Sequence, residues 1–373
     1  MSYALTGPAW VYAGRDALDH LGELLKDAKR ICLVSDPGVA QTSAFGLVSG
    51  RLKGLEVVLR ADAPTEPTLQ QARELCAQCA GSRPDAVVAV GGGSVMDCAK
   101  LMAAAVTNPK MAEELPGAQG IRVRGVRTVM IPTTAGTGAE ATGNAIVMLP
   151  EERIKQGVVS PLLMPDGVIL DPEMVRDLPA ALTAATGMDA LAHALECLIS
   201  RKANSFSDMF AMRALTCILP HIERSYREGG DLQARENMQL GAFYGGMSIA
   251  LSGTLAVHAL AYPLSGRLHL SHGRAIALLL PPVMKGFEPA CRAQFDRVAR
   301  ACALGEEGKR PSQALVERLY ALRAMFHLEK TRLPVEEIPE MAREAAGIRR
   351  LMDNNPCPMS LEQIEAIFRE IAL

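Results

Sequence analysis

One carboxylate and three imidazoles in the second half of the chain have the residue types and spacing of a metal site. Asp189 and His193 lie four residues apart in TGMDALAHALE, an Ala- and Leu-rich stretch without a helix breaker. On a helix, positions i and i+4 share one face about 6 Å apart along the axis, so one cation can contact both side chains. His258 follows in a second stretch that has no helix breaker until Pro263, and His272 precedes Gly273, where the chain can approach a site closely. Three neutral imidazoles and a carboxylate suit a divalent metal such as Zn²⁺ or Fe²⁺.

Spacing alone leaves another interpretation of these residues open. A histidine on an apolar helix is more often a hydrogen-bonded core residue than a ligand, and an acidic residue four positions before a histidine is common by chance. His269 is also a rival to His258 or His272 as a ligand.

The elements that must position these residues differ between the two halves of the chain. The first half alternates short Val- and Ile-rich segments with helical segments, a pattern that predicts βαβ units and a parallel sheet. The second half consists of long Ala-, Leu- and Met-rich stretches separated by turn signals, with no convincing strand. We therefore expect an α/β domain over 1–177 and an all-helical domain over 178–373. The expected strands are 30–36, 55–61, 86–92, 128–134 and 167–172.

Composition limits the classes of partner. The net charge of −2 and the absence of a long basic run argue against a nucleic-acid or anionic-membrane partner. Neither a signal-peptide pattern nor an apolar run near 18 residues occurs, which predicts a cytoplasmic protein. Nine cysteines in apolar contexts are typical of free buried thiols. We interpret Cys76 and Cys79 as one face of a helix, not as a zinc or redox motif.

Two glycine-bearing loops follow predicted strands and have phosphate-binding character. AVVAVGGGSVMDCAK places Gly91, Gly92 and Gly93 after a strand and Ser94 before a helical run, where backbone N–H groups and the helix dipole can hold a pyrophosphate. The loop is not GxGxxG and follows the third predicted strand, which argues against an ordinary Rossmann dehydrogenase. A glycine cluster can equally be a tight turn.

The second loop, PTTAGTGAE, follows the next predicted strand, and loops at adjacent strand ends favour a ligand crevice. The hydroxyls of Thr133, Thr134 and Thr137 can contact phosphate or ribose, or cap the following helix. Asp36, at the end of the first predicted strand, can accept hydrogen bonds from an adenosine ribose and repel a 2′-phosphate, which favours NAD over NADP. The alternative is that SDPG is only a turn opened by Asp36 and proline.

Taken together, these segments resemble the iron-containing (group III) alcohol dehydrogenase family. The resemblance is carried by GGGSVMDCAK, PTTAGTGAE, LDPEMVRDLPAALTAATGMDALAHALE, VHALAYPLSGRLHLSHGRAIALLLP and the C-terminal DNNPCPMSLEQIEAIFREIAL. It implies an N-terminal Rossmann-like dinucleotide-binding domain, a C-terminal helical-bundle domain, NAD(P) and a divalent metal, usually Fe(II) and sometimes Zn. It also implies a homodimer or higher homo-oligomer and a small alcohol or aldehyde as substrate.

The resemblance assigns roles residue by residue. Asp189, His193, His258 and His272 match the metal ligands. The positions matching cofactor contacts are Asp36, Gly92, Gly93, Ser94, Asp97, Thr133, Thr134, Thr137, Lys155 and Leu182. Asn144 matches a pocket residue beside the nicotinamide, and with Ile249 it suggests a pocket for a small polar or aliphatic substrate.

The chain departs from the family at one position. Many members have HxxxHPLG after the third ligand, whereas this chain has Tyr262 in HALAYPLS. The second histidine of that pattern is often given a proton-relay role, which here passes to Tyr262, a water molecule or the ribose hydroxyl. Within the same fold, glycerol dehydrogenase-like, maleylacetate reductase-like and lyase activities are alternatives, and a non-catalytic metal- and nucleotide-binding protein is a further one.

Overall fold

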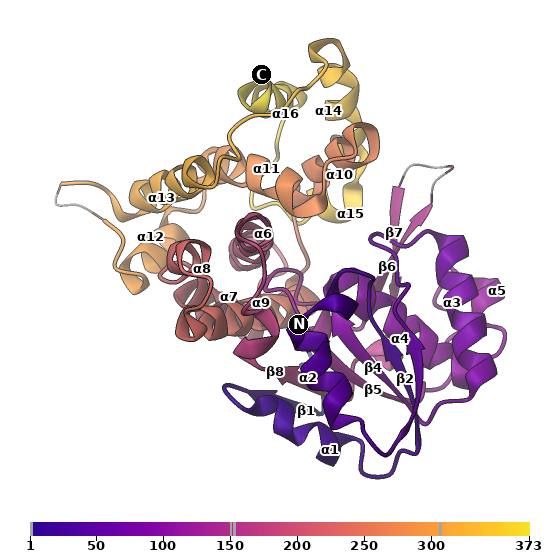
Figure 1. Cartoon of the computed structure of the whole chain (residues 1–373). Coiled ribbons are helices and arrows are strands. Elements are labelled where there is room, and N and C mark those ends of the chain that lie inside the picture. Colours follow the sequence, from indigo (N-terminus) through magenta and orange to yellow (C-terminus); the bar gives the residue numbers. More distant parts are fainter. Residues whose placement is uncertain (1–2, 150, 152–153, 306–307) are drawn as a thin grey trace.

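The Val- and Ile-rich segments of the first half form a six-stranded parallel sheet in the computed structural model, which describes residues 3–149, 151, 154–305 and 308–373. The strand order is β1-β8-β5-β4-β2-β3 (Figure 1). All five predicted strands are confirmed within a residue or two. The strands are β1 (Trp10–Ala13), β2 (Arg30–Val34), β3 (Glu56–Arg60), β4 (Ala86–Gly91), β5 (Arg127–Pro132) and β8 (Gly167–Leu170).

Helices cover both faces of this sheet, which is why its central strands are continuous apolar runs. Along β2, Ile31 and Leu33 pack into one core while Cys32 and Val34 pack into the other. The helices of this region are α1 (Leu21–Leu24), α2 (Ser43–Arg51), α3 (Leu69–Ser82), α4 (Gly93–Thr107) and α5 (Met111–Glu114). Cys76 and Cys79 lie on the buried face of α3 as free thiols, which confirms the interpretation of this pair as a helix face.

Three strands lie outside the expected set. β1 is a short edge strand paired with β8, and β6 (Asn144–Leu149) with β7 (Ile154–Val159) forms an antiparallel hairpin apart from the main sheet. Because β1 comes first, two positional expectations were wrong: the GGGS loop follows the fourth strand instead of the third, and Asp36 follows the second strand instead of the first.

The second half is helical, with no strand among its described residues beyond an isolated bridge between Thr331 and Ala372. Its long central helix α6 is apolar around most of its circumference and is buried among its neighbours (Figure 1). The helices are α6 (Ala180–Ile199), α7 (Ser205–Ile218), α8 (Ile222–Arg227), α9 (Leu232–Ser252), α10 (Ala256–Leu268), α11 (His272–Phe287), α12 (Arg292–Ala301), α13 (Pro311–Met325), α14 (Ile338–Gly347), α15 (Arg349–Met352) and α16 (Leu361–Ile371).

Among the described helices, none is by itself long and apolar enough to cross a membrane, and the one pair that passes by length and composition, α9 with α10, bends by 103° at its break.

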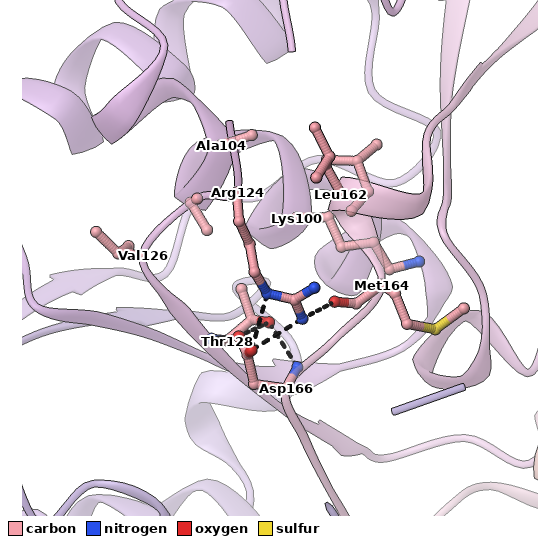
Figure 2. Close-up of a pocket in the computed structure, with 11 residues that line it drawn as sticks. Lys100, Ala104, Arg124, Val126, Thr128, Leu162, Met164 and Asp166 are labelled. Atoms are coloured by element: carbon pink, nitrogen blue, oxygen red, sulfur yellow. Dashed lines mark hydrogen bonds and ion pairs between the residues drawn. The ribbon is translucent and has the colours of Figure 1, made fainter. Parts of the chain in front are cut away.

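Polar contacts join the amino-terminal ends of the neighbouring strands β5 and β8. Arg124 donates to the Asp166 carboxylate at 3.0 Å and to the Met164 carbonyl at 2.7 Å, and the same carboxylate accepts from the Thr128 backbone N–H at 2.8 Å (Figure 2). The adjoining cavity measures only about 10 Å³, so this region is structural and has no room for a substrate.

Candidate metal centre and nucleotide-binding loops

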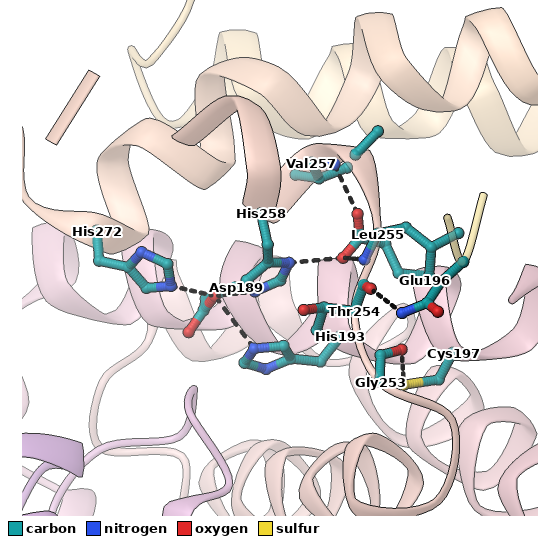
Figure 3. Close-up of polar contacts among 12 residues, drawn as sticks. Asp189, His193, Glu196, Cys197, Gly253, Thr254, Leu255, Val257, His258 and His272 are labelled. Atoms are coloured by element: carbon teal, nitrogen blue, oxygen red, sulfur yellow. Dashed lines mark hydrogen bonds and ion pairs between the residues drawn. The ribbon is translucent and has the colours of Figure 1, made fainter. Parts of the chain in front are cut away.

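Asp189 and His193 project from the same face of α6, one turn apart. The side chains are 2% and 7% exposed, and His193 Nε2 lies 3.6 Å from Asp189 Oδ1 (Figure 3). The helix forms here because its residues are good helix formers with no internal proline. Gly187 permits close packing around it, since a Cβ on Gly187 would lie 2.8 Å from Ile222.

The other two imidazoles arrive from different helices and meet the same oxygen. His258 Nε2, from α10, and His272 Nε2, from the first residue of α11, each lie 3.6 Å from Asp189 Oδ1 (Figure 3). The ligand atoms of Asp189, His258 and His272 lie within 4.8 Å of one another. The His193 ring stacks on His258 at 4.6 Å between centroids. All four residues named from the sequence therefore converge, whereas the rival His269 is exposed at the end of α10.

The unsatisfied atoms at this point fit a divalent cation. Asp189 Oδ1 and His258 Nε2 are buried and have no hydrogen-bond partner among the described residues. Ligands held about 2.1 Å from a tetrahedral metal lie about 3.4 Å apart, close to the 3.6 Å separations here. Buried polar atoms without partners are costly, and a cation would satisfy them together.

Two acceptors orient the imidazoles so that Nε2 faces the common point. The Nδ1–H of His258 donates to Glu196 Oε2 at 2.6 Å, and Nδ1 of His193 lies 3.4 Å from the carbonyl of Gly136. A proton on Nδ1 leaves the Nε2 lone pair for a metal, which is the usual arrangement of histidine ligands. Sequence reasoning missed Glu196, although it lies seven residues after Asp189 on the same helix face.

Burial and charge act in opposite directions on these groups. Burial raises the pKa of Asp189, but the three imidazoles outweigh burial and hold that pKa well below its usual range. Burial lowers the pKa of His258, but Glu196 and Asp189 outweigh burial and raise it to about 9. Burial lowers the pKa of His193 and of His272, and the positive charge of Lys155 lowers the pKa of His272 further. The cluster is thus an anionic carboxylate surrounded by imidazoles.

The GGGS loop joins β4 to α4 as expected, with Gly92 preceding the first helical residue Gly93. A Cβ on Gly93 would lie 2.8 Å from Thr137 Oγ1, so glycine is needed where the two glycine-bearing loops meet. The Ser94 hydroxyl accepts from the backbone N–H of Glu66 at 3.1 Å. The N-terminus of a 15-residue helix therefore lies at the carboxyl edge of the sheet, where an anion is stabilised.

The PTTAGTGAE loop connects the sheet edge to the metal cluster. Thr133 is buried and its Oγ1 has no hydrogen-bond partner among the described residues. Thr134 lies against Gly92, and the Thr137 hydroxyl accepts from the backbone N–H of Ala139. The loop therefore lies against the GGGS loop at Gly93 and against the candidate ligand His193 at Gly136.

Asp36 forms the turn that the alternative interpretation expected. Its Oδ1 accepts from the backbone N–H groups of Gly38 and Val39, each at 2.9 Å. The other carboxylate oxygen takes no part in this turn. Ribose recognition by Asp36 stays a prediction.

Asp97 lies in the second turn of α4, the helix that follows the GGGS loop, and is buried. Its carboxylate accepts from the Ile146 backbone N–H at 3.0 Å and pairs with Lys100 at 3.3 Å, while Lys100 also donates to the Asn144 carbonyl at 2.7 Å. Burial raises the pKa of Asp97 and lowers that of Lys100, although each partly compensates the other. The buried pair connects α4 to β6.

The remaining predicted positions lie on several different elements. Lys155 on β7 pairs with Glu66 at 2.5 Å, and Leu182 is exposed on the first turn of α6. Ile249 packs against the helical core. Tyr262 is half-buried one turn after His258, and its hydroxyl accepts from Arg350 at 2.6 Å.

Comparison with known proteins finds similarity over nearly the whole chain. The model of iron-containing alcohol dehydrogenases matches residues 8–172, and that of the C-terminal region of the Fe-containing alcohol dehydrogenase family matches 183–372. The chain is 33% identical to long-chain-alcohol dehydrogenase 1 of Geobacillus thermodenitrificans (strain NG80-2), over 97% of this chain and 94% of that protein. It is 36% identical to 4-hydroxybutyrate dehydrogenase of Cupriavidus necator, over 73% of each. A crystal structure of 1,3-propanediol oxidoreductase superposes with a TM-score of 0.92 at 29% identity, covering 100% of both chains.

Proposed function

The chain belongs to the iron-containing alcohol dehydrogenase family, and we propose that it interconverts a small aldehyde and its alcohol with NAD as the redox partner. The balanced reaction is aldehyde + NADH + H⁺ ⇌ alcohol + NAD⁺. The observation that carries this proposal is the convergence of Asp189 with three imidazoles next to a loop that adjoins a helix N-terminus.

We assign Asp189, His193, His258 and His272 as ligands of a divalent cation, Fe²⁺ in the first place and Zn²⁺ as the alternative. A cation held there would act as a Lewis acid on the substrate oxygen, while a bound nicotinamide would exchange hydride with the substrate carbon. The protein's own contribution is to supply one negative charge through Asp189 and to hold His193 and His258 in the required tautomers through Gly136 and Glu196.

The dinucleotide is proposed to lie along the two glycine-bearing loops. The helix N-terminus at Gly93 would hold the pyrophosphate, and the unsatisfied Thr133 hydroxyl would gain a partner. The proposed cofactor contacts are Asp36, Gly92, Gly93, Ser94, Asp97, Thr133, Thr134, Thr137, Lys155 and Leu182. Asp36 would favour NAD over NADP by repelling a 2′-phosphate.

Tyr262 is proposed to pass the proton between substrate and solvent, with a water molecule or the ribose hydroxyl as the alternative carriers. Its oxygen accepts from Arg350, so its own hydroxyl proton is available for donation. Asn144 and Ile249 stay proposed substrate-pocket residues.

The domain division, the cellular location and the oligomeric state belong to the same proposal. We infer a dinucleotide-binding domain over 1–177 and a metal- and substrate-binding domain over 178–373, a cytoplasmic location and a homodimer.

The relatives named above refer to a long-chain alcohol, a hydroxy acid and a diol. Family membership therefore leaves the substrate's length and end group to be decided by this chain's own pocket.

The test uses protein purified without oxygen and reconstituted with Fe²⁺ or Zn²⁺. NADH consumption is followed across a panel of short aldehydes, together with metal content and NADH affinity. His272→Ala should lose metal and turnover while NADH still binds. The matched control is His269→Ala, which removes an exposed histidine of the same segment and should behave as wild type. Turnover by metal-stripped wild type or by His272→Ala would refute the proposal.

A further inference from the structure

A cavity of about 340 Å³ lies between the β6–β7 hairpin and the helical region. Figure 1 shows the hairpin extending toward α10 and α15. Residues of these two helices line the cavity opposite the hairpin. The lining includes Met148 and Lys155 from the hairpin, Tyr262 and Ser265 from α10, and Ile348 and Arg350 from the segment around α15. This volume suits a small molecule.

Two residues that line the cavity lie on the face of α10 that carries the candidate ligand His258. His258, Tyr262 and Ser265 occupy positions i, i+4 and i+7, so they share a face of the helix. Tyr262 lies about 6 Å and Ser265 about 10 Å beyond His258 along the axis. A substrate with its carbonyl at the metal ligands can therefore place a tail a few atoms away in this cavity.

Two cations and one unsatisfied hydroxyl point to the charge of that tail. Arg350 is exposed, has no carboxylate partner among the described residues, and is held by Tyr262 through a 2.6 Å hydrogen bond and a ring contact at 5.6 Å. Its neighbour Arg349 is instead paired with Asp353 at 2.8 Å, and Arg267 is paired with three glutamates. Arg350 is thus held by Tyr262, and no carboxylate of the described residues neutralises its charge.

Ser265 supplies a second, independent observation. It is only 8% exposed, and its Oγ is buried without a hydrogen-bond partner among the described residues. Lys155, with a side chain 11% exposed, has Glu66 as its partner, so the cavity retains one net positive charge from Arg350 and Lys155 against Glu66. Guanidinium groups bind carboxylates and phosphate-like oxyanions with paired hydrogen bonds, and a hydroxyl can donate to the same oxygens.

We propose that this cavity binds the anionic tail of the aldehyde substrate, with Arg350 as the principal cation and Ser265 as a hydrogen-bond donor. The tail is a carboxylate, phosphonate or sulfonate one to three carbons from the carbonyl. Tyr262 completes the site by holding the guanidinium in place. This inference rests on the proposed function and names the substrate class of the same site.

The experiment compares matched aldehydes that differ in charge. Butanal and 4-oxobutanoate have the same chain length, and phosphonoacetaldehyde and sulfoacetaldehyde distinguish the kind of anion. The expected result is that wild type has a kcat/KM at least 10-fold higher for one anionic aldehyde than for butanal. Arg350→Gln should lower that ratio about 10- to 100-fold, mainly through KM, because a hydrogen-bonded charge is removed. Ser265→Ala should lower it several-fold.

Arg349→Gln is the control, since it removes an adjacent exposed guanidinium that already has a partner, and its ratio should match wild type. Equal losses for neutral and anionic aldehydes in Arg350→Gln, or no preference in wild type, would overturn the inference. A rise in KM for NADH with every aldehyde would overturn it as well, because the cavity would then serve the dinucleotide.

A binding measurement separates this inference from the proposed function. Succinate, phosphonoacetate and sulfoacetate are titrated into metal-loaded protein with NADH present. Binding of one of them that weakens at least 10-fold in Arg350→Gln and not in Arg349→Gln supports the cavity even if no aldehyde is reduced. If aldehydes are reduced but none of these anions binds through Arg350, the inference fails while the proposed function stands.

Discussion

Glu196 Oε2 lies 2.6 Å from His258 Nδ1, and this buried carboxylate also accepts from the backbone N–H groups of Leu255 and Val257 at 3.0 and 2.6 Å (Figure 3). One side chain of α6 therefore holds the start of α10 and fixes the tautomer of a proposed ligand on it. Carboxylates also stabilise a helix N-terminus through its dipole.

Glu196→Gln should weaken metal binding about 10- to 100-fold, because a partner that orients a ligand is lost. Metal affinity is measured by competition with a chelator, and circular dichroism checks the fold. Glu228→Gln, which changes an exposed carboxylate, serves as the control and should bind metal as wild type does. Unchanged affinity in Glu196→Gln would show that His258 needs no such support.

Asp36→Asn should distinguish the role of Asp36 in the turn from its proposed role in selecting NAD over NADP. Asparagine keeps the Oδ1 acceptor for Gly38 and Val39, so stability should change by less than about 1 kcal/mol, but the charge that repels a 2′-phosphate is lost. The ratio of kcat/KM for NADPH to that for NADH should rise about 10-fold. Asp27→Asn, at a carboxylate 72% exposed, should leave the ratio unaltered. A wild-type preference for NADPH would contradict the role given to Asp36.

Thr133→Val should affect ligand binding and stability in different ways. The buried Oγ1 has no partner among the described residues, so removing it should leave the cofactor-free protein equally stable or more stable by about 1 kcal/mol. NADH affinity should nevertheless fall several-fold. The contrasting variant is Thr142→Val, which removes a hydroxyl that is bonded to Lys100 and to the Ala139 carbonyl, and it should destabilise the protein. Unchanged NADH binding in Thr133→Val would exclude this hydroxyl from the cofactor site.

Glu140 should make stability fall as pH rises. Burial raises the pKa of this carboxyl to about 7, and the Lys100 charge offsets burial only in part. The unfolded carboxyl has a pKa near 4.5. Between these values the folded state binds more protons than the unfolded state, so the contribution of Glu140 is fully present below pH 4.5 and lost as pH passes 7. The loss is on the order of 3 kcal/mol.

The measurement is urea unfolding of wild type and Glu140→Gln at several pH values between 4.5 and 8. The stability of the variant relative to wild type should increase across this range, because glutamine cannot ionise. Glu113→Gln changes an exposed carboxylate and serves as the control, so its stability relative to wild type should show no such trend. A constant difference between wild type and Glu140→Gln would mean that the carboxyl of Glu140 has the same pKa in the folded and the unfolded protein, which would contradict the prediction.

Local patterns in the sequence predicted the regular elements well where burial dictates them. Segments such as 86–91 are buried on both faces and are continuous apolar runs, and the Ala-rich stretch around Asp189 consists of good helix formers without an internal proline. β1 was missed because it is a short edge strand with mostly exposed side chains, so its sequence carries little pattern. The β6–β7 hairpin was missed because it pairs with itself and lies apart from the main sheet.

The sequence by itself determined the chemistry of the site: the ligand types, the i,i+4 pair on α6, the two glycine-bearing loops and the family. It could do so because each depends on neighbouring residues and on short-range helix or turn geometry. Only the tertiary structure decided that His258 and His272 share one oxygen of Asp189, that Glu196 holds His258, and that Arg350 stands beside Tyr262. Residues as far apart in the chain as Tyr262 and Arg350 meet through the packing of whole helices, which no local pattern specifies.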